Sequence, residues 1–251
     1  MGSLSAQGLG PLPEVLPGED LATLILETPL GAQLHEGQVV VIAQKIVSKA
    51  EGAVVSLADV IPSQRALELA VEQEKDPRAV QVVLDQSTEI LRAERGVLIC
   101  RTPHGFVCAN AGVDASNSAD PETLIVLPRD PDASARAIRA RLRELTGVAP
   151  AVLITDSFGR AWRNGQVDVA IGIAGMQPLD DWRGRRDASG LELRATWLAV
   201  ADGAAAWADL ARAKDSREPI VVLDGLQRHV TTEDGPGVGE LLRPLEEDLF
   251  R

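Results

Sequence analysis

The stretch TDSFGRAWRNGQ, residues 155–166, directly follows the apolar run AVLI at residues 151–154. A continuous apolar run bounded by polar residues is typical of a buried strand. The twelve residues after it are too polar for a core, and two arginines beside an aspartate lose hydration energy unless a ligand or partner contacts them. Aspartate, serine, glycine and arginine at a strand end are the groups from which metal-bound phosphate sites are built. We therefore predict an active-site loop over residues 155–166.

The patterns on either side of this stretch predict helices and strands in mixed order. Helices are expected at residues 21–27, 64–75, 77–85, 131–146, 201–213 and 239–249. Strands are expected at residues 39–42, 88–92, 97–101, 105–109, 151–155, 167–173, 191–200 and 219–223. The elements do not alternate with a regular strand-helix-strand period. We therefore predict a mixed α+β fold with mostly antiparallel sheets and flanking helices.

The two ends of the chain differ in pattern. Residues 1–10, MGSLSAQGLG, are small and show no periodicity, so we predict a flexible N-terminus there. The remaining residues, 11–251, contain no internal repeat or low-complexity linker. They are predicted to form a single domain, with two intertwined subdomains as the alternative.

The composition excludes several classes of protein. A formal net charge of −12 argues against a nucleic-acid partner, which needs a basic face. No apolar run approaches the roughly 20 residues that span a bilayer, and no secretory signal pattern begins the chain, so we predict no membrane partner and a cytoplasmic location. Cys100 and Cys108 lack partners at metal-ligand spacing and are interpreted as reduced core residues.

Lysine is rare, yet two of the four lysines fall in QKIVSK at residues 44–49, directly after the expected strand at 39–42. Lys45 and Lys49 are four residues apart and would project from one side of a helical turn. Two ammonium groups at a strand end suit a polyphosphate. The alternative is a solvated charged face.

Two further loops carry groups that suit ligands. In AGVDASNS, residues 111–118, Asp114 and Asn117 supply hard oxygen ligands or a contact to a base, and an Asx turn is the alternative. RGRRDASG, residues 183–190, is a basic loop in an acidic protein, and an ordinary turn explains it equally well.

Within residues 155–166, each polar group has a candidate role. Asp156 and Ser157 are candidate ligands of Mg²⁺ or Mn²⁺. Arg160 and Arg163 are candidate catalytic residues that would bind phosphate or carboxylate with two hydrogen bonds each. A buried structural network of ion pairs is the alternative.

These motifs, in this order, resemble one family, the coenzyme F420-0:L-glutamate ligases, also called coenzyme F420:γ-glutamyl ligases. The resemblance extends from about residue 12 to the end of the chain. The stretches that carry it are LPEVLPGEDL at 12–21, QKIVSKAEG at 44–52, AGVDASN at 111–117, LPRDPDASA at 127–135, ITDSFGRAWRNGQVDVAIG at 154–172 and RDASGLEL at 186–193.

The resemblance implies a GTP-dependent ligase with its own fold, forming an intertwined homodimer. It implies that L-glutamate is added to the deazaflavin precursor F420-0, with GTP as co-substrate, Mg²⁺ or Mn²⁺ as cofactor and K⁺ as a further candidate. The acceptor carboxylate would be phosphorylated from the γ-phosphate, and the glutamate amine would attack the acyl phosphate to form an amide. The chain resembles the stand-alone form of the ligase.

The family's functional positions carry over to matching residues of this chain. Asp114 and Asp156 would bind one metal ion, and Ser157 would lie near a second. The nucleotide would be held at Leu12, Pro13, Glu14, Val15, Gln44, Lys49 and Asn117. One departure is Lys214, since members often have Gly-Gln or Gly-Glu where this chain has Ala213-Lys214. A charged lysine is no metal ligand, so Lys214 is expected to contact nucleotide phosphate, or the second metal site is weaker.

Two other classes of protein remain open from the sequence. A metal-dependent GTP phosphohydrolase would use the same aspartates with water as the acceptor. A non-catalytic GTP-binding protein would bind nucleotide without turnover. The group that deprotonates the glutamate amine is not indicated by any residue pattern.

Overall fold

The apolar run at residues 151–154 lies on β8, an inner strand of a five-stranded sheet of strand order β1-β12-β2-β8-β9. The strands are β1 (Ser5–Gly8), β2 (Val39–Ala43), β8 (Ala151–Arg160), β9 (Arg163–Ala174) and β12 (Ile220–Asp224). β2 and β8 pair in parallel, whereas the other neighbours pair antiparallel. Because helices cover both faces of this sheet, residues 39–42 of β2 and 151–154 of β8 are fully buried and read as continuous apolar runs. The computed structural model describes residues 3–116 and 120–248.

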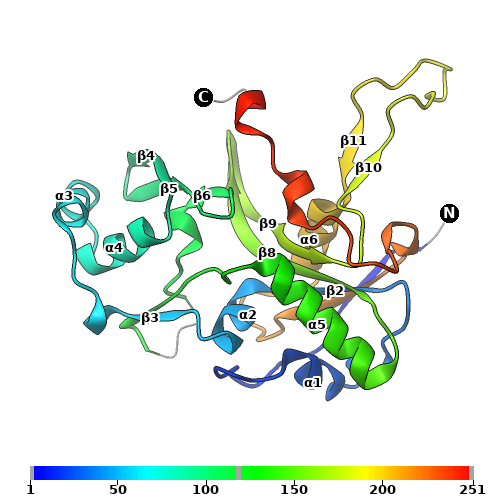
Figure 1. Cartoon of the computed structure of the whole chain (residues 1–251), viewed down its shortest axis with the longest axis horizontal. Helices are drawn as coiled ribbons and strands as arrows, with labels where there is room; N and C mark the ends of the chain where they lie inside the picture. The colour runs from blue at the N-terminus through cyan, green and yellow to red at the C-terminus, as the bar shows by residue number, and fades with distance from the viewer. Residues whose placement is uncertain (1–2, 117–119, 249–251) are drawn as a thin grey trace.

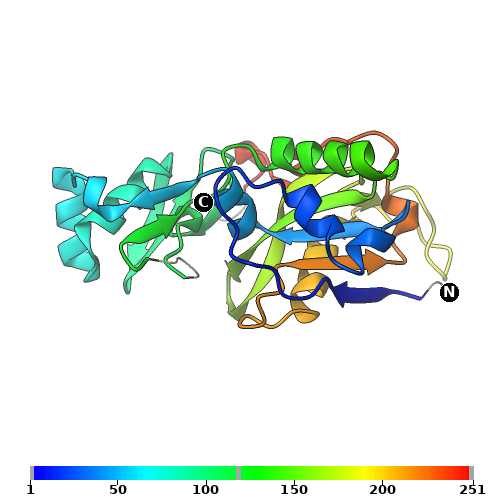
Figure 2. The ribbon, with the colours of Figure 1, turned by 90° about the horizontal axis from the view of Figure 1, so that it is seen from below.

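Helices on opposite faces of this sheet complete the main lobe, defined here as residues 3–52 and 127–248 (Figure 2). α5 (Pro131–Thr146) packs on one face and α6 (Val200–Leu210) on the other. α1 (Leu21–Leu26) lies against α5, and α2 (Gln44–Ala50) follows β2 directly. Asp130 caps α5 at its start, and Gly147 ends it in the left-handed conformation at φ 78°. Within the described part of the chain, no helix has the length and hydropathy needed to cross a membrane.

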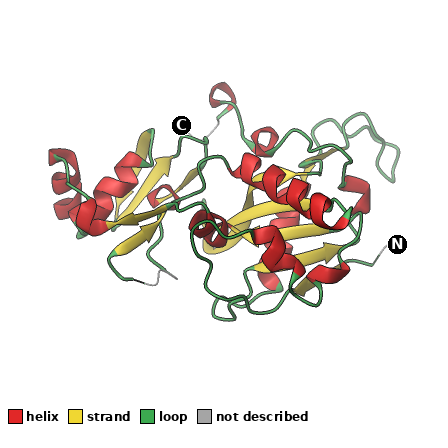
Figure 3. Cartoon of the chain, turned by 60° about the horizontal axis from the view of Figure 1, so that its bottom comes forward, coloured by secondary structure: helices red, strands yellow, loops and turns green. Residues whose placement is uncertain are grey.

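Residues 53–126 form a small lobe beside the tip of the β8–β9 hairpin (Figure 1). Its helices, α3 (Gln64–Gln73) and α4 (Pro77–Asp85), lie on the side away from the main lobe (Figure 3). They cover the three-stranded sheet of β4 (Glu89–Glu94), β5 (Val97–Arg101) and β6 (Val107–Ala109), and a second pair of strands comprises β3 (Val54–Ser56) and β7 (Thr123–Ile125). The small lobe has its own apolar clusters, separate from that of the main lobe.

A hairpin arm projects from the main lobe (Figure 1). Its strands are β10 (Leu179–Asp181) and β11 (Trp197–Ala199). RGRRDASG lies in the outer part of this arm, where Asp187 accepts N–H groups from Ser189 and Leu191 at 2.8 and 2.9 Å. The segment therefore contains the turn that the sequence offered as one alternative. Arg183 stacks over Trp197, with its guanidinium carbon 4.0 Å from the ring centroid.

The predicted mixed α+β fold with mostly antiparallel sheets is confirmed, with β2 and β8 as the parallel exception. The single-domain assignment and the intertwined dimer stay predictions. The flexible N-terminus over residues 1–10 is wrong for residues 5–8, which form β1 and pair with β12. An edge strand gains its hydrogen bonds from the backbone of its neighbour, so its side chains need not show a strong pattern.

Three further local predictions were wrong. Residues 155–166 are a continuation of β8 into a hairpin with β9 rather than a loop, because the pairing of the two strands continues beyond the buried part of the sheet. The strand expected at 191–200 is limited to residues 197–199. The closing helix expected over 239–249 consists, up to residue 248, of two short 3₁₀ turns, Val238–Leu241 and Leu245–Glu247, because Pro244 interrupts the segment between them.

Candidate active site

The candidate site lies where α2, β8 and the segment around Asp114 meet. Lys45, in the first turn of α2, places Nζ 2.7 Å from Asp114 Oδ2 and 2.6 Å from Ser116 Oγ. The predicted helical turn after β2 is confirmed, so this lysine extends from the carboxyl end of a central strand. Asp114 belongs to the small lobe and Lys45 to the main lobe. The ion pair therefore joins the two lobes.

The backbone around Asp114 is fixed by a reciprocal pair of hydrogen bonds with Ile125, at 3.0 and 2.8 Å. The Asp114 carboxylate accepts the N–H of Ser116 at 2.6 Å, which is an Asx turn. Burial alone would raise the pKa of Asp114, but Lys45 and Ser116 hold it below its ordinary value. The Asx turn is therefore compatible with Asp114 as an oxygen ligand of a metal ion, because the turn orients the ionised carboxylate.

Asp156, on β8, is the second carboxylate of this cluster. Burial, together with the nearby carboxylates of Asp168 and Asp114, raises the pKa of Asp156 to about 7, although Lys45 opposes the shift. Lys45, the cation that opposes the shift, is itself paired with Asp114. A poorly compensated carboxylate of this kind is stabilised by an additional cation.

Asp114 and Asp156 fit a hard divalent cation that arrives with a phosphate ligand. Mg²⁺ is usually held by one or two carboxylates, with waters and substrate phosphates completing its octahedron. Over residues 3–116 and 120–248, no three His, Cys, Asp or Glu side chains are grouped as a metal site. The two carboxylates therefore suit an ion that takes its remaining ligands from water and phosphate rather than from further protein side chains. Mg²⁺ or Mn²⁺ at these residues stays a prediction.

Ser157 points to the opposite face of the hairpin from Asp156, because successive residues of a strand alternate. It faces Asp168, its register partner on β9, and donates to Asp168 Oδ1 at 2.6 Å. Asp168 is 1% exposed, accepts the hydroxyl of Thr155 at 2.8 Å and is ion-paired with Arg212. Burial would raise the pKa of Asp168, but Arg212 and the two hydroxyls hold it below its ordinary value.

Lys214 lies on this second face as well. Its Nζ is 2.6 Å from Asp209 Oδ1, 2.9 Å from Ser157 Oγ and 3.5 Å from Asp168 Oδ1. The ammonium group therefore places a fixed positive charge beside Ser157, where the second metal ion was predicted. A contact between Lys214 and nucleotide phosphate stays a prediction.

The two candidate arginines lie at the hairpin tip, away from the carboxylates. Arg160 and Arg163 are register partners at the turn, and Arg160 donates to the carbonyl of Asn164 at 2.7 Å. Arg160 is four residues beyond Asp156, which is about 13 Å along an extended strand. Both side chains are exposed. The structure does not bring them into the cluster, and their catalytic role stays a prediction.

The predicted nucleotide residues near the N-terminus lie in the main lobe beside α2. Leu12 and Val15 are buried in its core, so only their backbone groups are available to a ligand. Pro13 and Glu14 are exposed, and Glu14 accepts a hydrogen bond from Lys49 Nζ at 2.5 Å. The structure thus brings this segment together with α2, as the prediction of one nucleotide site requires.

Gln44 carries a buried polar group that lacks a hydrogen-bond partner in the structure. Its Oε1 accepts the hydroxyl of Ser48 at 2.8 Å, whereas Nε2 is buried and unpaired. Such an orphaned donor is costly unless a ligand or water accepts from it. This observation fits the predicted nucleotide role of Gln44. Asn117, the remaining predicted residue, lies outside the described residues.

Sequence reasoning missed several members of the site. Lys45 was noted as part of a lysine pair but was not assigned to the aspartate cluster. Asp168 and Arg212 were not named at all. The alternation of residues on a predicted strand at 167–173 was a usable signal for Asp168, whereas Arg212 comes from the α6–β12 connection and had no local signal.

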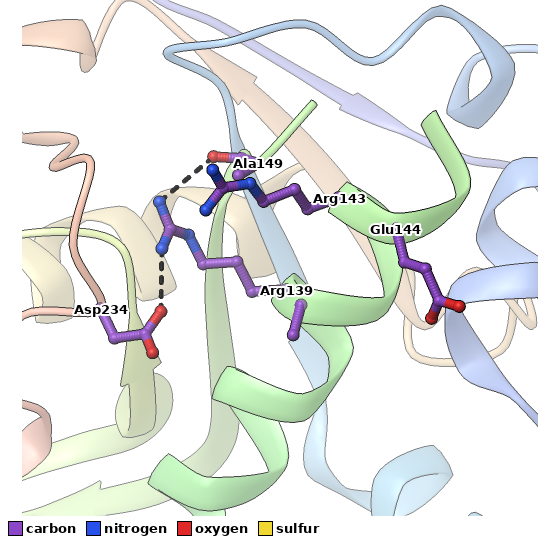
Figure 4. A pocket seen from close by; sticks show the side chains of 6 residues that line it. Arg139, Arg143, Glu144, Ala149 and Asp234 are labelled. Carbon is purple, nitrogen blue, oxygen red and sulfur yellow. Dashed lines mark hydrogen bonds and ion pairs between the residues drawn. The ribbon is translucent and has the colours of Figure 1, made fainter. Parts of the chain in front are cut away.

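A separate cavity of about 480 Å³ lies near the end of α5 (Figure 4). Its lining residues are Arg139, Ala140, Arg143, Glu144, Ala149 and Asp234. Buried Arg139 donates to Asp234 Oδ1 at 2.8 Å and to the carbonyl oxygens of Thr231 and Thr232 at 2.9 and 3.1 Å. These contacts join α5 to the C-terminal segment, so the role of Arg139 is structural.

Comparisons with known proteins agree with the motifs. Residues 10–225 match the family model described as F420-0:Gamma-glutamyl ligase. Coenzyme F420:L-glutamate ligase from Methanothermobacter thermautotrophicus is 44% identical over 251 residues, covering 99% of each chain. The protein of the same name from Methanopyrus kandleri is 45% identical over 256 aligned positions, covering 100% of each chain. That from Haloarcula marismortui is 41% identical over 247 residues, covering 96% of this chain and 93% of the relative.

Similarity of this extent, across both lobes, defines the chain as an enzyme of the ligase class. The resemblance found in the sequence is thereby confirmed. The chain belongs to the F420-0:gamma-glutamyl ligase family.

Proposed function

We propose that this enzyme joins L-glutamate to the deazaflavin precursor F420-0 in coenzyme F420 biosynthesis, with GTP as the source of energy. The family membership and the names of the relatives support the substrates. The observation that carries the proposal is the convergence of Asp114, Asp156 and Lys45 from three distant segments beside the orphaned Gln44 Nε2. Two carboxylates and a lysine are the groups that phosphoryl transfer to a carboxylate needs.

Each part of this constellation has a proposed role. GTP binds along residues 12–15 and α2, where Gln44 Nε2 donates to it and Lys49 contacts it. Asp114 and Asp156 hold Mg²⁺ or Mn²⁺, which supplies charge neutralisation to the phosphates. Lys45, at the carboxyl end of β2, adds a positive charge for the transferred phosphoryl group. Arg160 and Arg163 stay candidates for binding an anionic substrate from the hairpin tip.

The proposed chemistry proceeds in two transfers. The carboxylate of the acceptor attacks the γ-phosphorus of GTP, and GDP leaves as the bond between the β-γ bridging oxygen and the γ-phosphorus breaks. The neutral amine of glutamate then attacks the acyl phosphate and forms the amide as inorganic phosphate leaves. An oxygen of a carboxylate or phosphate accepts the amine proton. This route needs no side-chain nucleophile, because the acceptor itself forms the reactive intermediate.

We also propose that the enzyme acts as a homodimer. The arm at residues 179–199 supports this, because it projects from the main lobe and exposes Leu191, Trp197 and Leu198, which are 70%, 49% and 45% accessible. Exposed apolar side chains on a projecting element mark an association surface. K⁺ stays a further candidate cofactor with no residue assigned.

The test is a mass-spectrometric assay with GTP, Mn²⁺ or Mg²⁺, L-glutamate and F420-0. The expected result is a product heavier by one or more glutamyl units, formed together with GDP. Release of GDP and phosphate without that product would replace the proposal with a GTP phosphohydrolase. Nucleotide binding without turnover would replace it with a GTP-binding protein.

A further inference from the structure

The turn between β5 and β6 touches the segment through which the chain returns to the main lobe. His104, in this turn, places Nε2 3.0 Å from the carbonyl oxygen of Pro128 and 3.1 Å from that of Arg129. Carbonyl oxygens only accept hydrogen bonds, so Nε2 carries a proton and donates it to both. One imidazole N–H therefore ties the small lobe's sheet to the residues that precede α5.

The same ring begins an aromatic stack that ends on β8. The His104 and Phe106 rings are stacked at 5.4 Å between centroids, and Phe106 meets Phe158 edge-on at 6.2 Å. Phe106 is 4% exposed and packs in the core of the main lobe, although it belongs to the small lobe. Phe158 is two residues after Asp156, so both side chains lie on the same face of β8. The stack thus leads from the turn to the strand that carries Asp156.

The covalent connections alone do not fix how the lobes face each other. The chain crosses between them twice, and the crossings lie side by side, since Val126 N–H donates to Ala53 O at 3.1 Å and Ser48 Oγ donates to Val126 O at 2.7 Å. Paired crossings act as one hinge. Rotation about it would change the distance between Asp114 in the small lobe and Asp156 on β8.

The other ring nitrogen of His104 shows that this residue does more than fill space. Its Nδ1 is buried and has no hydrogen-bond partner in the structure. A phenylalanine or leucine would pack at this position without leaving a polar atom unsatisfied. The histidine therefore carries a cost that only its Nε2 donor offsets.

We propose that His104 is a positioning residue that fixes the β5–β6 turn against β8 and so sets the separation of Asp114 and Asp156. This inference rests on the proposed function, because it requires both carboxylates to act on one substrate complex. His104 itself contacts neither carboxylate. It acts through Pro128, Arg129 and Phe106.

Two substitutions separate the donor from the ring. His104→Gln retains a side-chain N–H donor and loses the ring, whereas His104→Phe retains the ring and loses the donor. With the full enzyme, GTP, Mn²⁺, L-glutamate and F420-0, His104→Phe is expected to lower kcat by about 10-fold to 100-fold, the scale of a misplacement near 1 Å. The KM for GTP should stay within about twofold, because the described nucleotide residues, those of 12–15 and α2, lie in the main lobe and stay in place.

His104→Gln is expected to recover kcat to within about threefold of the original enzyme, because it restores the hydrogen bond through which the positioning acts. Val107→Thr, an exposed change on β6, is the matched control and should leave kcat unchanged. Equal losses in the Gln and Phe variants, or an unchanged kcat in His104→Phe, would overturn the proposal. A rise in KM for GTP that accounts for the whole loss would overturn it too.

A second readout does not depend on activity. Amide hydrogen exchange over residues 97–109 and 127–130 should be faster in His104→Phe than in the original chain and His104→Gln, in the absence of substrates. Equal exchange in all three proteins would contradict the tether. If the original enzyme formed no glutamyl product, the proposed function would fail, while the exchange measurement would still decide whether His104 joins the lobes.

Discussion

Each face of the β8–β9 hairpin carries an aspartate, and the two aspartates differ in how well their negative charge is compensated. On one face, Asp168 is fully buried and is compensated by Arg212 and two hydroxyl groups. On the other, Asp156 is only partly compensated, and its pKa is raised to about 7. A shift of one register position across the β8–β9 pair thus separates a group that stabilises the fold from a group that awaits a ligand. Charge alone does not distinguish them, whereas the compensation of that charge does.

The largest expected effect is on turnover, from Asp156→Asn. The neutral amide retains the shape of the side chain but loses the charge that would hold a metal-phosphate complex, so ligase activity should fall by about 10²–10³-fold. The melting temperature should not fall, because the substitution removes a poorly compensated charge. Activity near the original level would sink the assignment of Asp156 to the reaction.

Asp168→Asn should show the reverse of Asp156→Asn, because its main effect should be a loss of stability rather than of turnover. Removing one partner of a buried ion pair leaves Arg212 uncompensated, and about 3–5 kcal/mol of unfolding free energy should be lost. Denaturant titration measures it. Asp181→Asn, which removes the exposed partner of Arg183, is the control, and its unfolding free energy should barely change because solvent screens this pair. Equal losses in both variants would break the contrast between buried and exposed pairs.

The two carboxylates should also give opposite pH trends in metal-free protein. The pKa of Asp156 is raised from 3.8 to about 7 by folding, so the stability from its protonated form is fully present below pH 3.8 and is lost as the pH rises from there through about 7. The pKa of Asp168 is lowered, so its stabilisation is present above the unfolded value of 3.8 and is lost as the pH falls through its folded pKa. Unfolding curves of the original chain and both Asn variants, recorded with a chelator across this range, measure the trends. Parallel curves for the two variants would refute this distinction.

The smallest effect is expected at Ser157. Ser157→Ala removes the hydroxyl that donates to Asp168 and should cost about 1 kcal/mol of stability. Ser157→Thr retains the hydroxyl and should be close to neutral in the same denaturant titration. If Thr were as destabilising as Ala, the methyl group rather than the hydrogen bond would decide this position.

The sequence predicted the buried part of the fold well, because its signals are local. The apolar run at 151–154 and the cap residues of α5 are determined by patterns within a few residues. The edge strand β1 was missed because its hydrogen bonds come from β12, more than two hundred residues later. The hairpin was read as a loop because its polar residues suggested a ligand, whereas strand pairing fixes its backbone whatever its side chains.

The candidate site divides in the same way. Asp114, Asp156 and the lysines of α2 carry recognisable motifs, and the structure brings Asp114, Asp156 and Lys45 together. Arg212 and His104 carry none, because each acts through contacts with segments distant in the chain. Arg160 and Arg163 are the opposite case, with a clear motif but no place in the cluster. Their motif predicted a position near the carboxylates, whereas the extended hairpin holds them at its tip.

The pairing of β1 with β12 has a consequence for synthesis of the protein. Gly8 lies opposite Val221, and β2 also pairs with β12, so the main sheet acquires two of its neighbour contacts only when residues 220–224 have left the ribosome. The small lobe, complete at residue 126, has its own apolar clusters and is available to fold much earlier. Until the last strand arrives, one side of β2 lacks its partner and exposes backbone groups to other chains. The nascent chain is therefore open to pairing with other chains from the emergence of β2 until residues 220–224 reach it.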